Sequence, residues 1–157
     1  MEQSFLSREK ELRHEFVCIS RDLHKFANSV ISPVCQRHGI TMQQMYVLME
    51  LRIDPNQAIG RLSDRVGIHH TNFVQVCRKL ESKGLVRRAR NDADKRSYIL
   101  SLTPEGENLY LALDKDITAT HALWLEAESD ETYRTIIQGM KALHAAIGRH
   151  NTSSGLE

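Results

Sequence analysis

The sequence predicts a mainly α-helical protein with one small β-hairpin, and three observations support this. Apolar residues recur at steps of three and four near both ends of the chain, as in amphipathic helices. In the middle, two short helical patterns are separated by a glycine-containing turn. Directly after them, two stretches rich in strand-forming residues flank the polar run NDADK, which predicts a hairpin.

The first predicted helix covers about residues 4–31. Pro33 lies near its end, and the sequence QRHG supplies a glycine stop signal. Its apolar positions fall on one stripe, formed by Leu12, Phe16, Ile19, Leu23, Phe26 and Val30. Because the stripe is longer than a lone helix needs, it is a candidate for core packing or for a seam with a partner.

The second predicted helix begins at Thr41, a good N-cap with Gln44 as its capping-box partner. It is mostly buried and is followed by a turn, RIDPNQ. Its methionines fit an ordinary core, and they also fit an adaptable pocket wall, since Met fills irregular space.

The next two helices are predicted around the turn at Gly67, the second over residues 70–82 with Gly84 as its stop. Two short helices around such a turn form a helix-turn-helix. The inward positions of the second helix are Phe73, Val76, Cys77 and Leu80. Its outward positions suit the DNA major groove, where Gln bonds adenine and Arg bonds guanine, and they are Thr71, Asn72, Val74, Gln75, Arg78 and Lys79. An amphipathic helix with a polar outer face is the alternative.

A hairpin follows, with strands LVRRAR and SYILSL around the tip NDADK. A helix-turn-helix followed by a basic hairpin is a winged helix. Arg96 at the tip of a stiff hairpin could enter the minor groove, with Asp94 holding its guanidinium by a forked pair. Lys95 could add a phosphate contact. The alternative is a solvated hairpin tip.

Two further helices complete the pattern. Thr103 caps a helix that starts at Pro104 and runs to about Leu125, and Ser129 or Asp130 caps a last helix over roughly 131–148. The last helix has an apolar stripe of Ile136, Ile137, Met140, Leu143, His144 and Ile147. Since the long helices at the two chain ends have no obvious partner within the chain, we expect a second copy to bury them.

Composition and charge agree with a DNA-binding protein. Residues 60–104 carry ten Lys/Arg against four Asp/Glu, in a chain of net charge +1. Such a basic segment favours a polyanion partner, although a solvated charged surface would give the same count. Three widely spaced cysteines argue against disulfides, and no apolar run is long enough to span a membrane. We therefore expect a cytoplasmic protein with no membrane partner.

With the hairpin included, the sequence resembles the MarR family of bacterial transcriptional regulators. The resemblance covers nearly the whole chain and is strongest in GLVRRARNDADKRSYILSLTPEG. The residues that match the family pattern are Gly84, Leu85, Val86, Asp94, Arg96, Leu100, Leu102, Thr103 and Gly106.

The domain organisation follows from this resemblance. We expect one MarR-type domain over residues 1–150. It comprises a winged helix at about 41–103 and dimerisation helices at about 4–34 and 104–149. The tail 151–157 is expected to be disordered and to end in a possible tag remnant.

The resemblance implies a homodimer that reads a pseudo-palindromic DNA site, probes the minor groove with Arg96 and usually represses transcription. The candidate DNA contacts are His69, His70, Thr71, Asn72, Gln75, Arg78, Lys79, Arg88, Arg90, Asp94, Lys95 and Arg96. The family often has Ser or Thr where His69 stands and Arg near Gln75, so base preference is expected to differ.

The sequence offers two candidate signals for the control of such a regulator. The family default is a small aromatic or phenolic effector, for which His24, Met42, Met45 and Tyr46 are candidate neighbours. A cysteine-based redox sensor is the alternative. In that case Cys18 would react, with its thiol pKa lowered by His14 and Arg21.

Other classes of function fit the sequence less well. No metal-ligand spacing, cofactor motif or catalytic motif is present, so neither a cofactor nor an enzymatic activity is expected. A winged helix used for protein contacts would need an apolar outer face on residues 71–79, where polar and basic residues stand.

Overall fold

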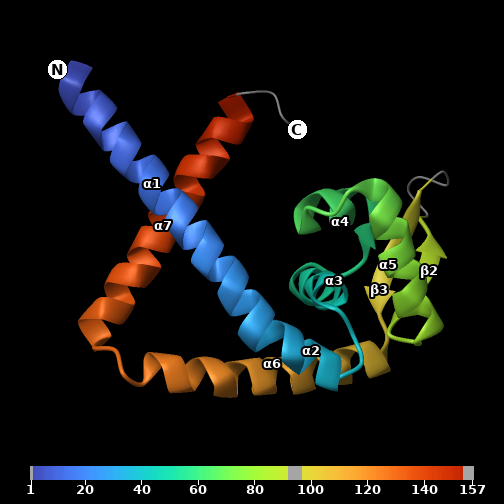
Figure 1. The fold of residues 1–157 in the computed structure, drawn as a ribbon. Coiled ribbons are helices and arrows are strands. Elements are labelled where there is room, and N and C mark those ends of the chain that lie inside the picture. The colour runs from blue at the N-terminus through green and yellow to red at the C-terminus, as the bar shows by residue number, and fades with distance from the viewer. Residues whose placement is uncertain (1, 92–96, 154–157) are drawn as a thin grey trace. The chain divides into compact units, whose positions relative to one another are not determined.

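The computed structural model describes residues 2–91 and 97–153. The chain divides into two compact units, Met1–Ile117 and Thr118–Glu157. As predicted, the fold is mainly helical with a small antiparallel β-wing (Figure 1). Within the described ranges, no helix is both long and apolar enough to cross a membrane.

The N-terminal helix continues past its predicted end at residue 31. It consists of α1 (Glu2–Phe26), the π-helical turn η1 (Ala27–Ile31) and α2 (Ser32–Arg37). Pro33 has no N–H to donate, and just before it the Ser32 amide bonds back to the Ala27 carbonyl, five residues earlier. The wider π-helical turn accommodates Pro33, so the helix continues instead of ending there.

The predicted apolar stripe of α1 lies on the surface of the single chain. Leu12, Phe16, Ile19 and Leu23 are between 49 % and 67 % exposed, whereas Phe26 and Val30 are half-buried. Within one chain, most of the stripe therefore does not form core.

The second predicted helix is α3 (Met42–Ile53), and its capping box is confirmed. The Gln44 amide donates to Thr41 Oγ1 at 3.3 Å, and the Thr41 amide donates to Gln44 Oε1 at 3.0 Å. Met45 is buried, with the Cys35 thiol 3.5 Å from its sulfur. Met45 therefore belongs to the hydrophobic core.

The segment predicted as a simple turn, RIDPNQ, overlaps the end of α3 and includes the first residue of a strand. Asn56 takes a left-handed φ of 62°, and β1 (Gln57–Ala58) then pairs with β3 (Tyr98–Leu102). The Gln57 side chain donates to the Glu50 and Asp54 carbonyls at 3.1 and 2.9 Å, which satisfies the end of α3. Strand β1 could not be predicted from the sequence, because a two-residue strand shows no periodicity.

The helix-turn-helix follows the prediction closely. It consists of α4 (Ile59–Val66) and α5 (His70–Ser82), the latter with the predicted bounds. Gly67 and Gly84 end these helices with φ of 67° and 69°. This left-handed conformation suits glycine, which has no Cβ to clash.

The hairpin strands are β2 (Val86–Arg90) and β3, and the sheet order is β1-β3-β2. Val86 pairs with Leu102 at the base of the hairpin, and Arg90 pairs with Tyr98 near its tip. Figure 1 shows α3, α4 and α5 gathered beside these strands.

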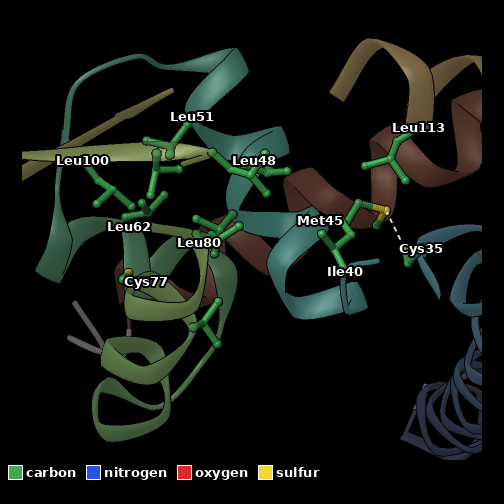
Figure 2. Close-up of a cluster of buried hydrophobic side chains, with 14 of the residues drawn as sticks. Cys35, Ile40, Met45, Leu48, Leu51, Leu62, Cys77, Leu80, Leu100 and Leu113 are labelled. Carbon is green, nitrogen blue, oxygen red and sulfur yellow. Dashed lines mark hydrogen bonds between the residues drawn. The ribbon is translucent and has the colours of Figure 1, made fainter. Parts of the chain in front are cut away.

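The core of the first unit joins the helices to the sheet. Figure 2 shows Leu48 and Leu51 of α3 near Leu62, Leu80 and Leu100, all buried. All four predicted inward residues of α5 are buried: Phe73, Val76, Cys77 and Leu80. This packing fixes which side of α5 faces outward.

The start of α6 (Pro104–Leu125) is clamped to the base of the wing. The Thr103 hydroxyl donates to the Gly84 carbonyl at 2.6 Å and accepts the Gly106 amide at 3.0 Å. The Thr103 amide also donates to the Leu85 carbonyl at 3.1 Å. Thr103 is thus the cap that the sequence predicted and also a link to the hairpin.

The second unit contains the end of α6 and α7 (Asp130–Ser153). Ser129 is the cap, since its hydroxyl accepts the Thr132 amide at 3.1 Å. Helix α7 runs past the predicted end at 148 and includes the first three residues of the stretch expected to be a disordered tail. Extending an existing helix costs far less than starting one, so weak helix formers can continue it.

Candidate nucleic-acid interface

The outer face of α5 carries polar and basic side chains next to the hairpin. Figure 1 shows α5 running beside β2 and β3. The predicted contacts exposed on this helix are His70, Thr71, Asn72, Gln75, Arg78 and Lys79, and Val74 is half-buried.

His69 precedes α5 as its N-cap residue and is exposed. Its carbonyl accepts the amides of Asn72 and Phe73, but its side chain makes no capping hydrogen bond. The His69 side chain therefore does not cap the first turn of α5. A Ser or Thr at this position would accept a hydrogen bond from an amide of that turn.

Some basic residues of the predicted patch are engaged within the fold. Arg65 Nε lies 2.7 Å from Glu50 Oε2, and Arg65 Nη1 lies 3.3 Å from Asp54 Oδ2. Arg61 lies 3.7 Å from the same Asp54 oxygen, and Lys83 bonds the Gly39 carbonyl. These side chains hold α4 and α5 to α2 and α3, so they contribute less free charge than the sequence count suggested.

Other basic residues keep their charge available. Among the described residues, Arg78, Lys79, Arg88 and Arg90 have no carboxylate within 4.0 Å, and all four are exposed. They lie on α5 and β2, the elements that carry the predicted DNA contacts. Arg61 and Arg65 are instead paired with carboxylates of the fold. The four unpaired side chains are therefore the ones available to bind an anion.

A groove of about 430 Å³ lies between α5 and the hairpin. Arg78 of α5 and Arg88 of β2 line its walls, together with His70. The Arg88 guanidinium stacks on the Tyr98 ring, with 3.8 Å from the guanidinium carbon to the ring centroid. Sequence reasoning missed Tyr98, because only the strand register shows that it lies beside Arg88.

A smaller cavity of about 200 Å³ lies between α3 and α5. Thr41 and Gln43 line one side, and Asn72, Gln75 and Lys79 line the other. Three of the predicted contacts of α5 are thus brought together next to the start of α3.

The tip of the hairpin lies outside the described residues. The predicted contacts Asp94, Lys95 and Arg96 belong to it. At its base the Asn91 amide donates to the Ser97 carbonyl at 3.1 Å, and Asn91 Nδ2 donates to Ser97 Oγ at 3.1 Å. The described part of the wing therefore ends at two residues, Asn91 and Ser97, that are hydrogen-bonded to each other across the hairpin.

A family model described as "MarR family" matches residues 38–97, which run from the end of α2 through the helix-turn-helix to the start of β3. Over its winged helix-turn-helix, the chain is similar to the MarR family of transcriptional regulators. MarR transcriptional regulators are not enzymes.

Similar proteins include a degradative operon repressor. The chain is 32 % identical over 84 residues to the homoprotocatechuate degradative operon repressor of Escherichia coli, covering 54 % of this chain and 57 % of that repressor. It therefore spans less than two thirds of the length of that curated relative.

Solved MarR structures share the fold. A MarR transcriptional regulator from Methanosarcina mazei Go1 matches with a TM-score of 0.77 and 24 % identity, covering 86 % of this chain and 98 % of that one. The transcriptional repressor CouR, solved bound to a 23-mer DNA duplex, matches with a TM-score of 0.70 and 26 % identity, covering 82 % and 89 %.

The candidate effector residues are not brought together around either cavity described above. Met45 is core, while Met42 and Tyr46 are half-buried against that core. His24 is exposed on α1, where its Nε2 lies 2.9 Å from Asn28 Nδ2. Neither the groove nor the smaller cavity is lined by any of these four side chains.

The redox candidate Cys18 is half-buried on α1, with its sulfur 3.7 Å from His14 Nε2. Arg21, expected to help activate it, donates to Asp22 at 3.3 Å and also interacts with Cys18. Burial raises the pKa of the Cys35 thiol, and burial with nearby Glu81 raises the pKa of Cys77 to about 11. Cys18 is therefore the most accessible of the three thiols.

Metal binding was not expected from the sequence. Among the residues that the structure describes, no three His, Cys, Asp or Glu side chains gather as a metal site.

Proposed function

We propose that this chain is a sequence-specific double-stranded DNA-binding transcriptional regulator, and that α5 reads the major groove. One observation carries the proposal: the basic side chains on α5 and β2 have no carboxylate partner among the described residues, whereas those of α4 do. The exposed Gln75 and Arg78 have the hydrogen-bonding groups that distinguish adenine and guanine. Lys79, Arg88, Arg90, His69 and His70 are proposed phosphate contacts.

The wing tip is proposed to reach the minor groove. By the resemblance, Arg96 enters the groove, Asp94 orients it and Lys95 meets a phosphate. The family match extends to residue 97 and so includes these positions. The DNA-bound CouR supports DNA as the partner of this fold.

The regulator is proposed to act as a homodimeric repressor on a pseudo-palindromic operator. The exposed apolar side chains of α1 support self-association, and α7 carries its own set: Tyr133, Ile136, Met140, Leu143 and Ile147. Burying such stripes against a second copy would remove them from water. The E. coli relative is named as an operon repressor, which supports repression over activation.

The effector is proposed to be a small phenolic acid, bound near His24, Met42, Met45 and Tyr46. The name of the E. coli relative refers to a phenolic acid, homoprotocatechuate. Adding such acids to the DNA complex should lower DNA affinity, and Tyr46→Ala should weaken that response.

A redox-sensing regulator is the second candidate, because the Cys18 sulfur lies 3.7 Å from an imidazole nitrogen of His14. The thiol and the imidazole are close enough to interact, and Cys18 is less buried than the other two cysteines. Peroxide should then lower DNA affinity in the wild type but not in Cys18→Ser.

The organisation and location of the regulator belong to the same proposal. Residues 1–150 form one functional MarR-type domain, with a winged helix at 41–103 between dimerisation helices. A cytoplasmic location is proposed because such a regulator must reach the chromosome.

The proposal is tested by titrating the protein against duplex DNA from upstream of its own gene. Fluorescence anisotropy would follow binding, with random duplex as competitor. We expect specific binding that strengthens at low salt, and a loss of about 1–3 kcal/mol for Arg96→Ala. Equal affinity for both duplexes, with no effect of Arg96→Ala, would contradict it.

A further inference from the structure

Arg88 is held in a different way from the other arginines with described partners. Its guanidinium stacks on the Tyr98 ring at 3.8 Å from the ring centroid. Arg52 and Arg65 are instead held by carboxylates at 2.7 Å. A carboxylate neutralises an arginine and occupies its N–H donors. An aromatic ring covers only one face and leaves the charge and the in-plane donors available.

The strand register explains how the two residues meet. Arg88 pairs with Leu100 and Arg90 pairs with Tyr98, so Arg88 and Tyr98 are diagonal neighbours on one face of the hairpin. That face is the one on which Leu100 enters the core. The stack is therefore set by β2 and β3 and does not depend on the hairpin tip.

The stacked guanidinium lines the groove beside α5. Arg88 and Tyr98 line one wall, and Val74, Cys77 and Arg78 line the other. Glu81 also lines this groove, but among the ion pairs of the described residues none within 4.0 Å joins it to Arg88. Two arginines thus flank a hollow of about 430 Å³, and neither is neutralised by a described residue.

We propose that Tyr98 is a positioning residue that holds Arg88 over this groove for contact with a backbone phosphate of double-stranded DNA. The proposal rests on the function proposed above and adds a residue to that site. A free arginine side chain loses conformational freedom when it binds. Stacking on Tyr98 restricts the side chain beforehand, so less freedom is lost on contact. Since phosphates are the same in every sequence, the contribution is independent of operator sequence.

The test is a double-mutant cycle with Tyr98→Leu, Arg88→Ala and the combined variant. Binding to operator and to random duplex would be followed by anisotropy at several salt concentrations. Tyr98→Leu should weaken binding to both duplexes roughly 3-fold, the size of an exposed cation–π contact. Arg88→Ala should lower the slope of log affinity against log salt by about 0.9, the value for one phosphate.

Three comparisons separate positioning from a general loss of structure. Tyr98→Phe keeps the ring and should bind like the wild type. Tyr98→Leu should have no further effect once Arg88 is alanine. Arg52→Ala, which removes a cation paired with Glu107, should leave the salt slope unchanged.

The possible outcomes are distinct. If Tyr98→Leu binds like the wild type, or weakens binding equally with and without Arg88, the positioning role is wrong. Loss of binding in Tyr98→Phe would also overturn it. If the wild type binds no duplex at all, the proposed function fails, and this inference fails with it.

Discussion

Gly106 lies so close to Leu85 that a Cβ on Gly106 would be 2.0 Å from the Leu85 carbonyl oxygen. The first turn of α6 is therefore packed directly on the backbone that leads into β2. Thr103 joins the same two segments through its bond to the Gly84 carbonyl. Together they fix the base of the wing relative to α6.

Gly106→Ala should destabilise the protein by about 2 kcal/mol, because the added methyl must displace backbone. Gly60→Ala is the matched control, since its Cβ would meet nothing within 4 Å. Urea unfolding followed by circular dichroism would measure both. Equal midpoints for the two variants would show that the contact is not tight.

Thr103→Val should cost about 1–2 kcal/mol, since the Gly84 carbonyl loses a donor and the Gly106 amide loses its acceptor. Thr103→Ser keeps the hydroxyl and should retain most of the stability. The same unfolding measurement applies. A serine variant as unstable as the valine variant would assign the effect to the methyl group instead.

The contact between α2 and α6 should make stability depend on acid pH. Asp116 Oδ2 lies 2.8 Å from His38 Nε2, and this hydrogen bond lowers the pKa of the Asp116 carboxyl. A lowered folded-state pKa contributes stability above the ordinary aspartate pKa, and this is lost as pH falls through the folded value.

Asp116→Asn removes that dependence. The variant should be less stable than the wild type at pH 5, and the gap should shrink at pH 3 and below. Both pH values lie below the ordinary histidine pKa, so imidazole charges change little between them. A gap that stays constant from pH 5 to pH 2 would contradict the assignment.

Self-association should depend on the exposed stripe of α1. We expect the wild type to sediment at about twice the chain mass of 18.0 kDa. Ile19→Glu puts a charge into the stripe and should shift the protein toward monomer. Ser20→Glu, at the neighbouring exposed position, should not. A monomeric wild type, or an unchanged Ile19→Glu variant, would exclude this interface.

The features that could be predicted well from the sequence are those determined by residues close together along the chain. The cap at Thr41, the bounds of α5 and the stops at Gly67 and Gly84 each depend on a few adjacent residues. The apolar pattern likewise identified the buried face of α5, because helical spacing alone sets which residues share a side.

The features that sequence missed depend on long-range partners. Strand β1 exists because it pairs with Ile99 and Leu100, more than forty residues away. The charge count of the basic segment could not separate Arg65 from Arg78, because the acids that hold Arg65 lie on α3 and at its end. The stack of Arg88 on Tyr98 required the hairpin register.

The central claim, that α5 reads specific bases as part of a dimer, is most directly tested by selection from random duplexes. The wild type should enrich a pseudo-palindrome with half-sites about 10 base pairs apart. Arg78→Ala should lose preference at one position in each half-site while keeping the spacing. No enriched sequence for the wild type, or an identical one for Arg78→Ala, would contradict the account.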